Sequence, residues 1–190
     1  MNYREEINNA CRVLEEGGVI LYPTDTIWGV GCDATNPEAV AKVYKLKRRA
    51  DNKAMSVLVD STAKIDFYVD TPSDLAWDLI DMATRPLTII YDRARNLAPN
   101  LLAEDGSVGI RVTQERFSHD LCQHFRKAIV STSANFSGCP SPATFADIDP
   151  ELIKAVDYVV QYGQDSTEPT GKPSSIVKLF HDGQVEIIRE

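Results

Sequence analysis

Apolar and polar residues alternate along the chain with the periods of helices and strands. Residues 5–16 place apolar side chains at i, i+3, i+4 and i+7, which is the spacing of an amphipathic helix, and a glycine pair ends it. Residues 19–22 form a short apolar run that is typical of a buried strand and is stopped by Pro23. Asn36 then predicts a helix N-cap, because Pro37 follows it at the first helical position.

The rest of the chain continues this alternation. Further strands are predicted at residues 55–59, 86–91, 107–112, 128–132, 158–161, 175–180 and 184–189. Further helices are predicted at residues 73–82, 115–127 and 150–156. Helices and strands alternate first and a hairpin closes the chain, so the fold class is α/β with a twisted, mixed sheet. No repeat or linker interrupts the pattern, which predicts a single domain over residues 1–190.

Composition excludes several classes of protein. The chain has 190 residues, of which 43% are hydrophobic and 25% charged, as in ordinary globular proteins. No apolar run approaches the ~20 residues of a membrane span, and no secretory leader is visible, so we expect a cytoplasmic protein without membrane association. The four cysteines are widely spaced and predict reduced, packed thiols. His119, Cys122 and His124 do not share one helix face and lack a fourth ligand, so no metal site is predicted.

Charge is concentrated in one segment. The net charge is −8, yet residues 42–53 hold six basic residues and one acidic residue, a net charge of +5, which leaves −13 for the rest. The helix that Pro37 opens packs Val40, Val43 and Tyr44 inward, and its lysines are expected to point outward or to lie at its C-terminal end. Such a segment either presents cations to an anion or is a solvated basic face, and charge alone leaves both interpretations open.

Familiar nucleotide and hydrolase motifs do not explain the chain. Residues 29–34 match GxGxxA, but they do not sit at a direct strand-to-helix turn, so a Rossmann site is not predicted. The P-loop pattern GxxxxGK[ST] and the GxSxG elbow are both absent from the sequence. Three polar segments at predicted strand or helix ends remain: residues 23–26, residues 131–135, and residues 47–53. Hydroxyls, amides and cations gathered beyond strand ends suit a polyanionic ligand, although each segment alone reads as ordinary caps and turns.

These segments carry a family resemblance. Residues 23–31, PTDTIWGVG, resemble the PTDTVYGLG signature of YrdC-like proteins, the threonylcarbamoyl-AMP synthases. The other matching elements follow in the same order: Lys47-x-Arg49 with residues 53–56 (KxR and KPLS), residues 107–112 (VGIRVP), residues 131–138 (STSAN-SG), and residues 174–177 with 187–189 (the STIV and LR hairpin). The resemblance spans residues 5–189 and rests on five elements.

The resemblance implies a fold, a reaction and a set of ligands. The fold is a YrdC-like twisted mixed sheet flanked by helices around a positively lined cavity. The substrates are ATP, L-threonine and bicarbonate or CO2, and Mg²⁺ is the expected cofactor, bound through the ATP phosphates. The products are threonylcarbamoyl-AMP and pyrophosphate. The adduct passes to a downstream tRNA threonylcarbamoyl transferase complex.

The resemblance also assigns residues to roles. The four-residue catalytic signature falls on Lys47, Arg49, Ser133 and Asn135. The threonine-binding positions fall on Thr26, Arg111, Ser131 and Ser174. The ATP-binding positions fall on Arg49, Lys53, Ser107, Ser133, Ser141 and Arg189. The sequence departs from the family pattern at Trp28, Ala54 and Thr113, and Leu58 stands where some members have a threonine-contacting histidine.

Two alternative functions from other classes fit parts of the sequence. An RNA-binding module of the same fold would use the basic segment, but Tyr44 is its single interleaved aromatic residue and the rest of the chain is acidic. We therefore expect at best weak, salt-dependent tRNA binding. A carbamoyl-adenylate enzyme that uses carbamoyl phosphate resembles domains of hydrogenase maturation proteins, whose zinc-finger and acylphosphatase segments are missing from this sequence.

Overall fold

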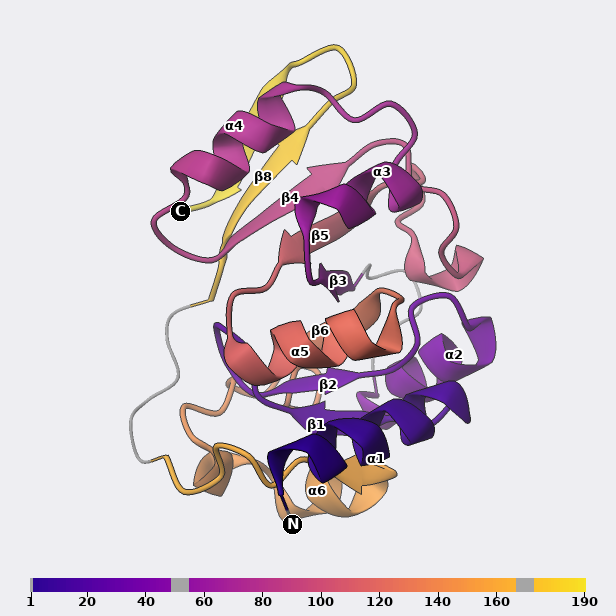
Figure 1. The fold of residues 1–190 in the computed structure, drawn as a ribbon, viewed down its shortest axis with the longest axis vertical. Helices are drawn as coiled ribbons and strands as arrows, with labels where there is room; N and C mark the ends of the chain where they lie inside the picture. The colour runs from indigo at the N-terminus through magenta and orange to yellow at the C-terminus, as the bar shows by residue number, and fades with distance from the viewer. Residues whose placement is uncertain (1, 49–54, 167–172) are drawn as a thin grey trace.

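A computed structural model describes residues 2–48, 55–166 and 173–190 (Figure 1). The helices are α1 (Tyr3–Glu15), α2 (Pro37–Leu46), α3 (Ile65–Tyr68), α4 (Leu75–Met82), α5 (Arg116–Phe125) and α6 (Pro150–Ala155). The strands are β1 (Ile20–Tyr22), β2 (Gly29–Gly31), β3 (Ser56–Val59), β4 (Leu87–Tyr91), β5 (Val108–Val112), β6 (Ile129–Ser133), β7 (Tyr158–Val159), β8 (Ser175–Leu179) and β9 (Val185–Arg189).

Within the described ranges the nine strands form one sheet in the order β7-β1-β2-β6-β3-β5-β4-β8-β9. Strand pairs β1–β7, β3–β5 and β4–β8 are parallel, and the other pairs are antiparallel. The predicted class, α/β with a mixed sheet, is confirmed. Several neighbours in this order, such as β2 and β6 or β4 and β8, come from distant parts of the sequence, so residues from both halves of the chain meet on one surface.

Local sequence signals explain where the main helices begin. The Asn2 side chain accepts from the Glu5 backbone N–H, and the Glu5 carboxylate accepts from the Asn2 N–H, which forms a capping box for α1. Asn36 caps α2 by accepting from the Glu38 and Ala39 N–H groups, as its position before Pro37 predicts. Each cap satisfies backbone donors that the first helical turn leaves without partners.

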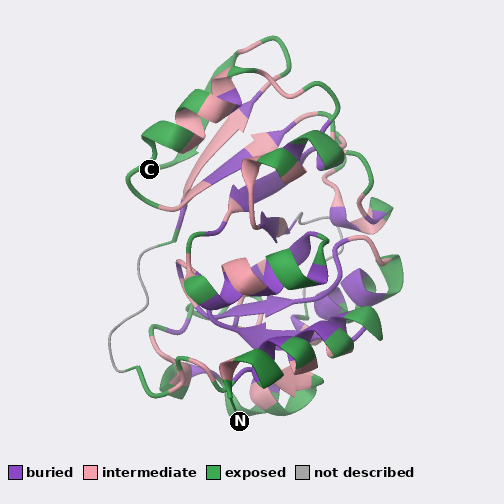
Figure 2. Cartoon of the chain, in the orientation of Figure 1, coloured by how far each residue is buried: buried purple, intermediate pink, exposed green. Residues whose placement is uncertain are grey.

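Two apolar clusters hold the layers together. One buries the inward faces of α1 and α5 against side chains of the sheet that include Leu58 and Ile129. The other lies on the opposite side and includes Val57 and Val130, the strand neighbours of those two residues. Figure 2 shows the buried strands between helices whose outer faces are exposed. Alternate residues of β3 and β6 therefore serve opposite faces, as the two-residue period of a strand requires.

One strand was not predicted. Residues 29–31 form β2, which pairs with both β1 and β6. A Cβ at Gly31 would clash with the Val130 carbonyl and lie 2.7 Å from Tyr22 Cε1, so glycine is needed for the close approach of these strands. Glycine has low strand propensity, and three residues give little alternation, so this segment carries no strand signal. Elsewhere the predicted bounds shift by a few residues, and the strand at 158–161 shortens to Tyr158–Val159.

None of the helices in the described part of the chain is both long and apolar enough to cross a membrane. The cysteines are free thiols: Cys11, Cys32 and Cys122 are buried, while Cys139 is exposed. The prediction of packed thiols is therefore correct for three positions and wrong for Cys139, which lies in a polar turn after β6. Among the described residues, no group of three or more His, Cys, Asp or Glu side chains is placed to hold a metal ion.

Candidate active site

One face of the sheet carries a row of small and polar residues that crosses it from β2 to β9. Strand pairing places Ser133 opposite Gly29 and Ser131 opposite Ser56. On the far side of β5 the row continues with Thr88 opposite Ile176, and Ile176 opposite Arg189. Directly paired residues share a face, so strands that are distant in sequence present these side chains together.

A cavity of about 240 Å³ opens over this row. Its lining includes seven of the residues that the family resemblance assigns to ligands: Thr26, Arg111, Ser131, Ser133, Ser141, Ser174 and Arg189. The other lining residues are Ile27, Trp28, Gly29, Met55, Ser56, Thr132, Pro173 and Ile176. The described lining contains two guanidinium groups and no carboxylate. A cavity of this chemistry favours an anionic ligand.

The lining residues that received no predicted role mostly lie inside the motifs that carried the resemblance. Trp28 and Gly29 belong to the first motif, and Met55 and Ser56 to the KPLS-like element. Thr88, which contacts the lining residue Ser174 but is not itself in the lining, belongs to no motif, and only the strand register brings it to the site. Gly109 makes room there, since a Cβ at this position would lie 2.9 Å from Ser56 Oγ and 3.1 Å from Thr88 Cγ2.

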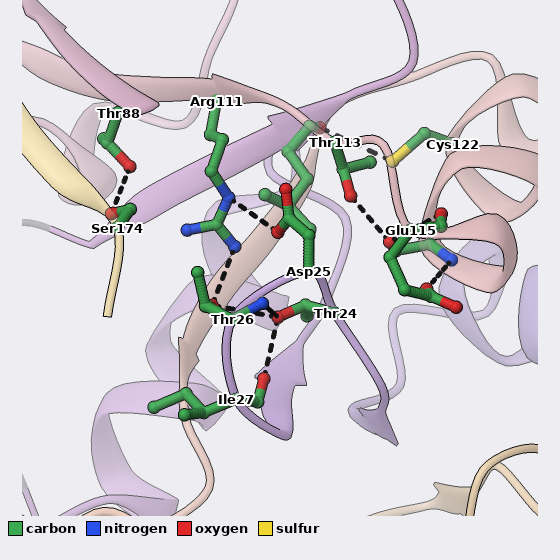
Figure 3. A network of polar contacts seen from close by, with 12 residues as sticks. Thr24, Asp25, Thr26, Ile27, Thr88, Arg111, Thr113, Glu115, Cys122 and Ser174 are labelled. Atoms are coloured by element: carbon green, nitrogen blue, oxygen red, sulfur yellow. Dashed lines mark hydrogen bonds and ion pairs between the residues drawn. The ribbon is translucent and has the colours of Figure 1, made fainter. Parts of the chain in front are cut away.

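Arg111 of β5 is held by the connection between β1 and β2 (Figure 3). Its Nε lies 3.0 Å from Asp25 Oδ1, and its Nη2 donates to Thr26 Oγ1 at 3.3 Å. The side chains of Arg111 and Asp25 are only 7% and 10% exposed. Burial raises the pKa of Asp25, and the charge of Arg111 and a hydrogen bond from the Gln114 backbone oppose that rise.

Thr24 fixes the same connection from inside. Its hydroxyl donates to the Ile27 carbonyl at 2.7 Å and accepts from the Thr26 N–H at 3.2 Å. The Thr24 and Thr26 hydroxyl oxygens lie 3.1 Å apart. A threonine hydroxyl can take the place of a helix or sheet hydrogen-bond partner for nearby backbone groups, which stabilises a tight connection. Thr24 therefore fixes the β1–β2 connection that carries Asp25 and Thr26, the two residues in contact with Arg111.

Ser174, the residue before β8, also lines the cavity. Its hydroxyl lies 2.8 Å from Thr88 Oγ1, as Figure 3 shows. Its backbone carbonyl accepts from Arg189 Nε at 2.9 Å and from Arg189 Nη2 at 2.7 Å. The two arginines of the lining are thus anchored separately, Arg111 by the β1–β2 connection and Arg189 by the start of β8.

Lys47 follows α2 and is buried, with 2% of its surface exposed. Its ammonium group donates to the Ser133 carbonyl and lies 3.4 Å from both Ser133 Oγ and Asn135 Oδ1. The Lys47 carbonyl in turn accepts from the Ser137 N–H at 3.0 Å. Three members of the predicted catalytic signature are therefore in contact. The expectation of a lysine at the C-terminal end of the helix is met, but this lysine points inward.

Other predicted residues lie apart from the lining or outside the described ranges. Arg49 and Lys53 fall outside the described residues. Ser107 is buried and donates to Asp105 Oδ1 at 2.6 Å, and it is not among the lining residues. Asn135 lies beside the cavity, in a groove that shares Ser141 with it.

The interpretation of the serine-rich segment as a loop beyond a strand end needs correction. Ser131 and Ser133 belong to β6 itself, where Ser131 pairs with Ser56 and Ser133 with Gly29. The site therefore lies over a face of the sheet, not beyond its carboxyl edge. Serine is common in turns, which favours a loop for this segment, whereas here the Ser131 and Ser133 side chains line a polar cavity.

The fold and the cavity define an α/β protein with a polar cavity whose lining includes two arginines. The family model of Sua5, YciO and YrdC proteins, described as "Telomere recombination", matches residues 12–190. The chain belongs to this family.

Individual relatives agree with that assignment. A protein of Methanocaldococcus jannaschii is 38% identical over 175 residues, which cover 92% of this chain and 80% of that one. The threonylcarbamoyl-AMP synthase of Pseudoalteromonas translucida is 31% identical over 182 residues, which cover 93% of this chain and 94% of that one. The crystal structure of P. abyssi Sua5 complexed with L-threonine has the same fold, with a TM-score of 0.84 and 20% identity. That match covers 94% of this chain, which spans about half (52%) of the Sua5 chain.

Proposed function

We propose that this protein is a threonylcarbamoyl-AMP synthase, a nucleotidyltransferase that makes threonylcarbamoyl-AMP and pyrophosphate from L-threonine, bicarbonate or CO2, and ATP. Family membership and the name of the Pseudoalteromonas relative support this activity. The observation that carries it is the cavity, because seven residues that the resemblance assigns to ligands line a single space.

The amino acid is proposed to bind on the Arg111 side. A guanidinium group has a rigid fork of donors that matches a carboxylate, so Arg111 is the natural clamp for the threonine carboxylate. Thr26, Ser131 and Ser174 offer hydroxyl groups for the threonine hydroxyl and amine. The P. abyssi Sua5 complex with L-threonine supports an amino-acid site in this fold.

ATP is proposed to occupy the remainder of the cavity. Arg49, Lys53 and Arg189 would meet phosphate oxygens, and Ser107, Ser133 and Ser141 would supply hydrogen bonds to the nucleotide. Arg189 and Ser141 already line the cavity with Ser133. The roles of Arg49, Lys53 and Ser107 rest on the motif match alone.

The proposed reaction needs no protein nucleophile. The threonine amine adds to CO2 and loses a proton, which gives a carbamate. A carbamate oxygen then attacks the α-phosphorus of ATP, the bond to the bridging oxygen breaks, and pyrophosphate leaves. Lys47, Arg49, Ser133 and Asn135 would stabilise the charge on the reacting oxygens. Holding three reactants in register can supply ~7–11 kcal/mol of the barrier.

Mg²⁺ fits this site only as a partner of the nucleotide. The described lining offers hydroxyl oxygens but no carboxylate, so the ion would be held mainly by phosphate oxygens and water. When bound it would neutralise charge on the triphosphate.

The RNA-binding alternative is the weaker one for a physical reason. Of the basic segment, Lys47 is buried, Lys42 donates to the Gly17 carbonyl at 2.7 Å, and the Arg48 guanidinium lies 4.4 Å from the centre of the Phe136 ring. Fewer cations are left for phosphates than the charge count suggests. We propose in addition that the protein binds tRNA at most weakly and passes its product to a tRNA threonylcarbamoyl transferase complex. We also propose a cytoplasmic location.

The test is pyrophosphate release by the purified protein with ATP, Mg²⁺ and bicarbonate. Release that requires L-threonine, is weaker with serine and is nearly absent with valine would support the synthase. Binding of ATP or threonine without release would indicate a relative of the same fold with another acceptor. If neither ligand bound, tRNA retardation on a gel at two salt concentrations would test the RNA-binding alternative.

A further inference from the structure

Asp25 has no role in the motif assignments, although it lies next to Thr26. It is absent from the cavity lining, while Thr26 and Arg111 both belong to it. Its carboxylate instead lies 3.0 Å from Arg111 Nε, and Figure 3 marks this ion pair with a dashed line. The other side of Asp25 faces a separate, mostly apolar cavity of about 290 Å³ that includes Ile110 and Gln114. Asp25 is therefore placed to act on Arg111 and not on a ligand in the first cavity.

Two consecutive residues hold two edges of the Arg111 guanidinium. The Asp25 carboxylate lies at ion-pair distance from Nε, without the alignment of a hydrogen bond, and Thr26 accepts from Nη2. A guanidinium carries five N–H donors, so donors remain for a ligand once these two are engaged. An arginine side chain that is held in one orientation loses less conformational entropy when it binds a carboxylate.

Electrostatics also favour such a pair at this depth. A buried guanidinium without a counter-charge is costly, and a carboxylate at ion-pair distance reduces that cost. Asp25 thereby allows Arg111 to stay buried and charged at the cavity wall. The pair keeps the positive edge of the fork available to an anion that enters from the cavity.

We propose that Asp25 is a positioning residue that orients Arg111 for a ligand carboxylate. This inference deepens the proposed function and rests on it, since the carboxylate concerned is that of L-threonine. Asp25 itself touches no reactant. It selects for the carboxylate by fixing the group that binds it.

The test compares L-threonine with L-threoninamide, which lacks the carboxylate charge, by calorimetric titration of the wild-type protein and of Asp25→Asn. We expect Asp25→Asn to weaken L-threonine binding about 10-fold or more while L-threoninamide binding stays within about twofold. Arg111→Lys keeps the charge but lacks the fork of donors, so it should likewise lower the ratio of the affinity for L-threonine to the affinity for L-threoninamide. Asp33→Asn is the matched control, because Asp33 is also a buried aspartate in an ion pair, 2.7 Å from Lys127, and does not line the cavity.

The outcomes separate the possible failures. Equal weakening of both ligands by Asp25→Asn, or an unchanged ratio of affinities, would overturn the positioning role. A similar loss of the ratio in Asp33→Asn would also overturn it, because general destabilisation would then explain the effect. If the wild-type protein did not bind L-threonine at all, the proposed function would fail, and this inference with it.

Discussion

The Lys47 ammonium group donates a hydrogen bond to the backbone carbonyl of Ser133, although 86 positions separate the two residues in the chain. The return contact from the Ser137 N–H to the Lys47 carbonyl, at 3.0 Å, ties the same two segments a second time. The chain that follows α2 and the chain that ends β6 are thereby locked together where the catalytic signature lies. Lys47 thus ties the local fold together, and under the proposed function it would also supply positive charge to the site.

Replacing Lys47 by methionine separates these roles. Lys47→Met keeps the length of the side chain but removes a charged donor from partly buried acceptors, which should lower the free energy of unfolding by about 1–3 kcal/mol. Pyrophosphate release should fall by roughly 100-fold or more, because one charged donor at the reacting centre is lost. Urea denaturation and the release assay measure the two effects. Lys45→Met, at an exposed position of α2, should change neither. Activity of Lys47→Met within about twofold of wild type would contradict the catalytic role.

Periodicity and caps predicted most of the fold from the sequence. The helix that Asn36 begins and the positions of most strands follow from local patterns. The strand order does not, because β6 lies between β2 and β3 through long-range pairing that no local pattern encodes. Local sequence does not predict the strand at Gly29–Gly31, because glycine is a poor strand former. Glycine is required there by the close approach of neighbouring strands, which only the folded sheet reveals.

The sequence predicts those site residues that belong to recognisable motifs. Ser131 and Ser133 are identified by their motif, and the predicted strand at 128–132 includes Ser131 but ends before Ser133, which belongs to β6 as well. Thr88 and Asp25 escaped assignment for another reason. Each acts on a predicted residue, Thr88 on Ser174 and Asp25 on Arg111, and such supporting contacts depend on strand register and burial.

Arg49→Ala tests the phosphate clamp that the KxR motif implies. We expect Arg49→Ala to lose most adenylate formation while its urea unfolding curve stays near that of the wild type, because a cation that meets phosphate contributes mainly to the reaction. Arg48→Ala is a neighbouring control, since Arg48 packs on Phe136 and pairs at 3.5 Å with the exposed Glu151. Exposed pairs of this kind contribute little to stability. Near wild-type rates in Arg49→Ala would remove this residue from the mechanism.

Ser174→Ala should relax the choice between threonine and valine. A site that hydrogen-bonds a substrate hydroxyl rejects an analogue without it by ~10⁴–10⁵, because its polar groups would be left unpaired. Removing the Ser174 hydroxyl takes away one such group and its contact with Thr88. The ratio of threonine to valine turnover should drop by about 10-fold or more in competition assays. Ser141→Ala, on the proposed nucleotide side, should raise the KM for ATP without changing that ratio. A ratio that Ser174→Ala leaves intact would place the threonine hydroxyl elsewhere in the cavity.

The two aspartates Asp25 and Asp105 should affect stability with opposite dependence on pH. Burial raises the pKa of Asp25 above its unfolded value of about 3.9, despite Arg111. The folded state then binds the proton more tightly than the unfolded chain, so the contribution of Asp25 is fully present below pH ~4 and is lost as pH rises through the folded pKa. Hydrogen bonds from Lys178 and then Ser107 lower the pKa of Asp105 to about 2, so its contribution is present above pH ~4 and is lost as pH falls toward 2.

Unfolding by urea at a series of pH values distinguishes the two cases. The free energy of unfolding of Asp25→Asn, minus that of the wild type, should rise with pH above about 4, by at most ~1.4 kcal/mol per pH unit. For Asp105→Asn the same difference should become more negative between about pH 2 and 4 and then stay constant, because only the wild type gains the ionised, hydrogen-bonded carboxylate there. Parallel curves for Asp25→Asn and the wild type above pH 4 would mean that Arg111 holds the Asp25 carboxylate ionised as readily as water does in the unfolded chain.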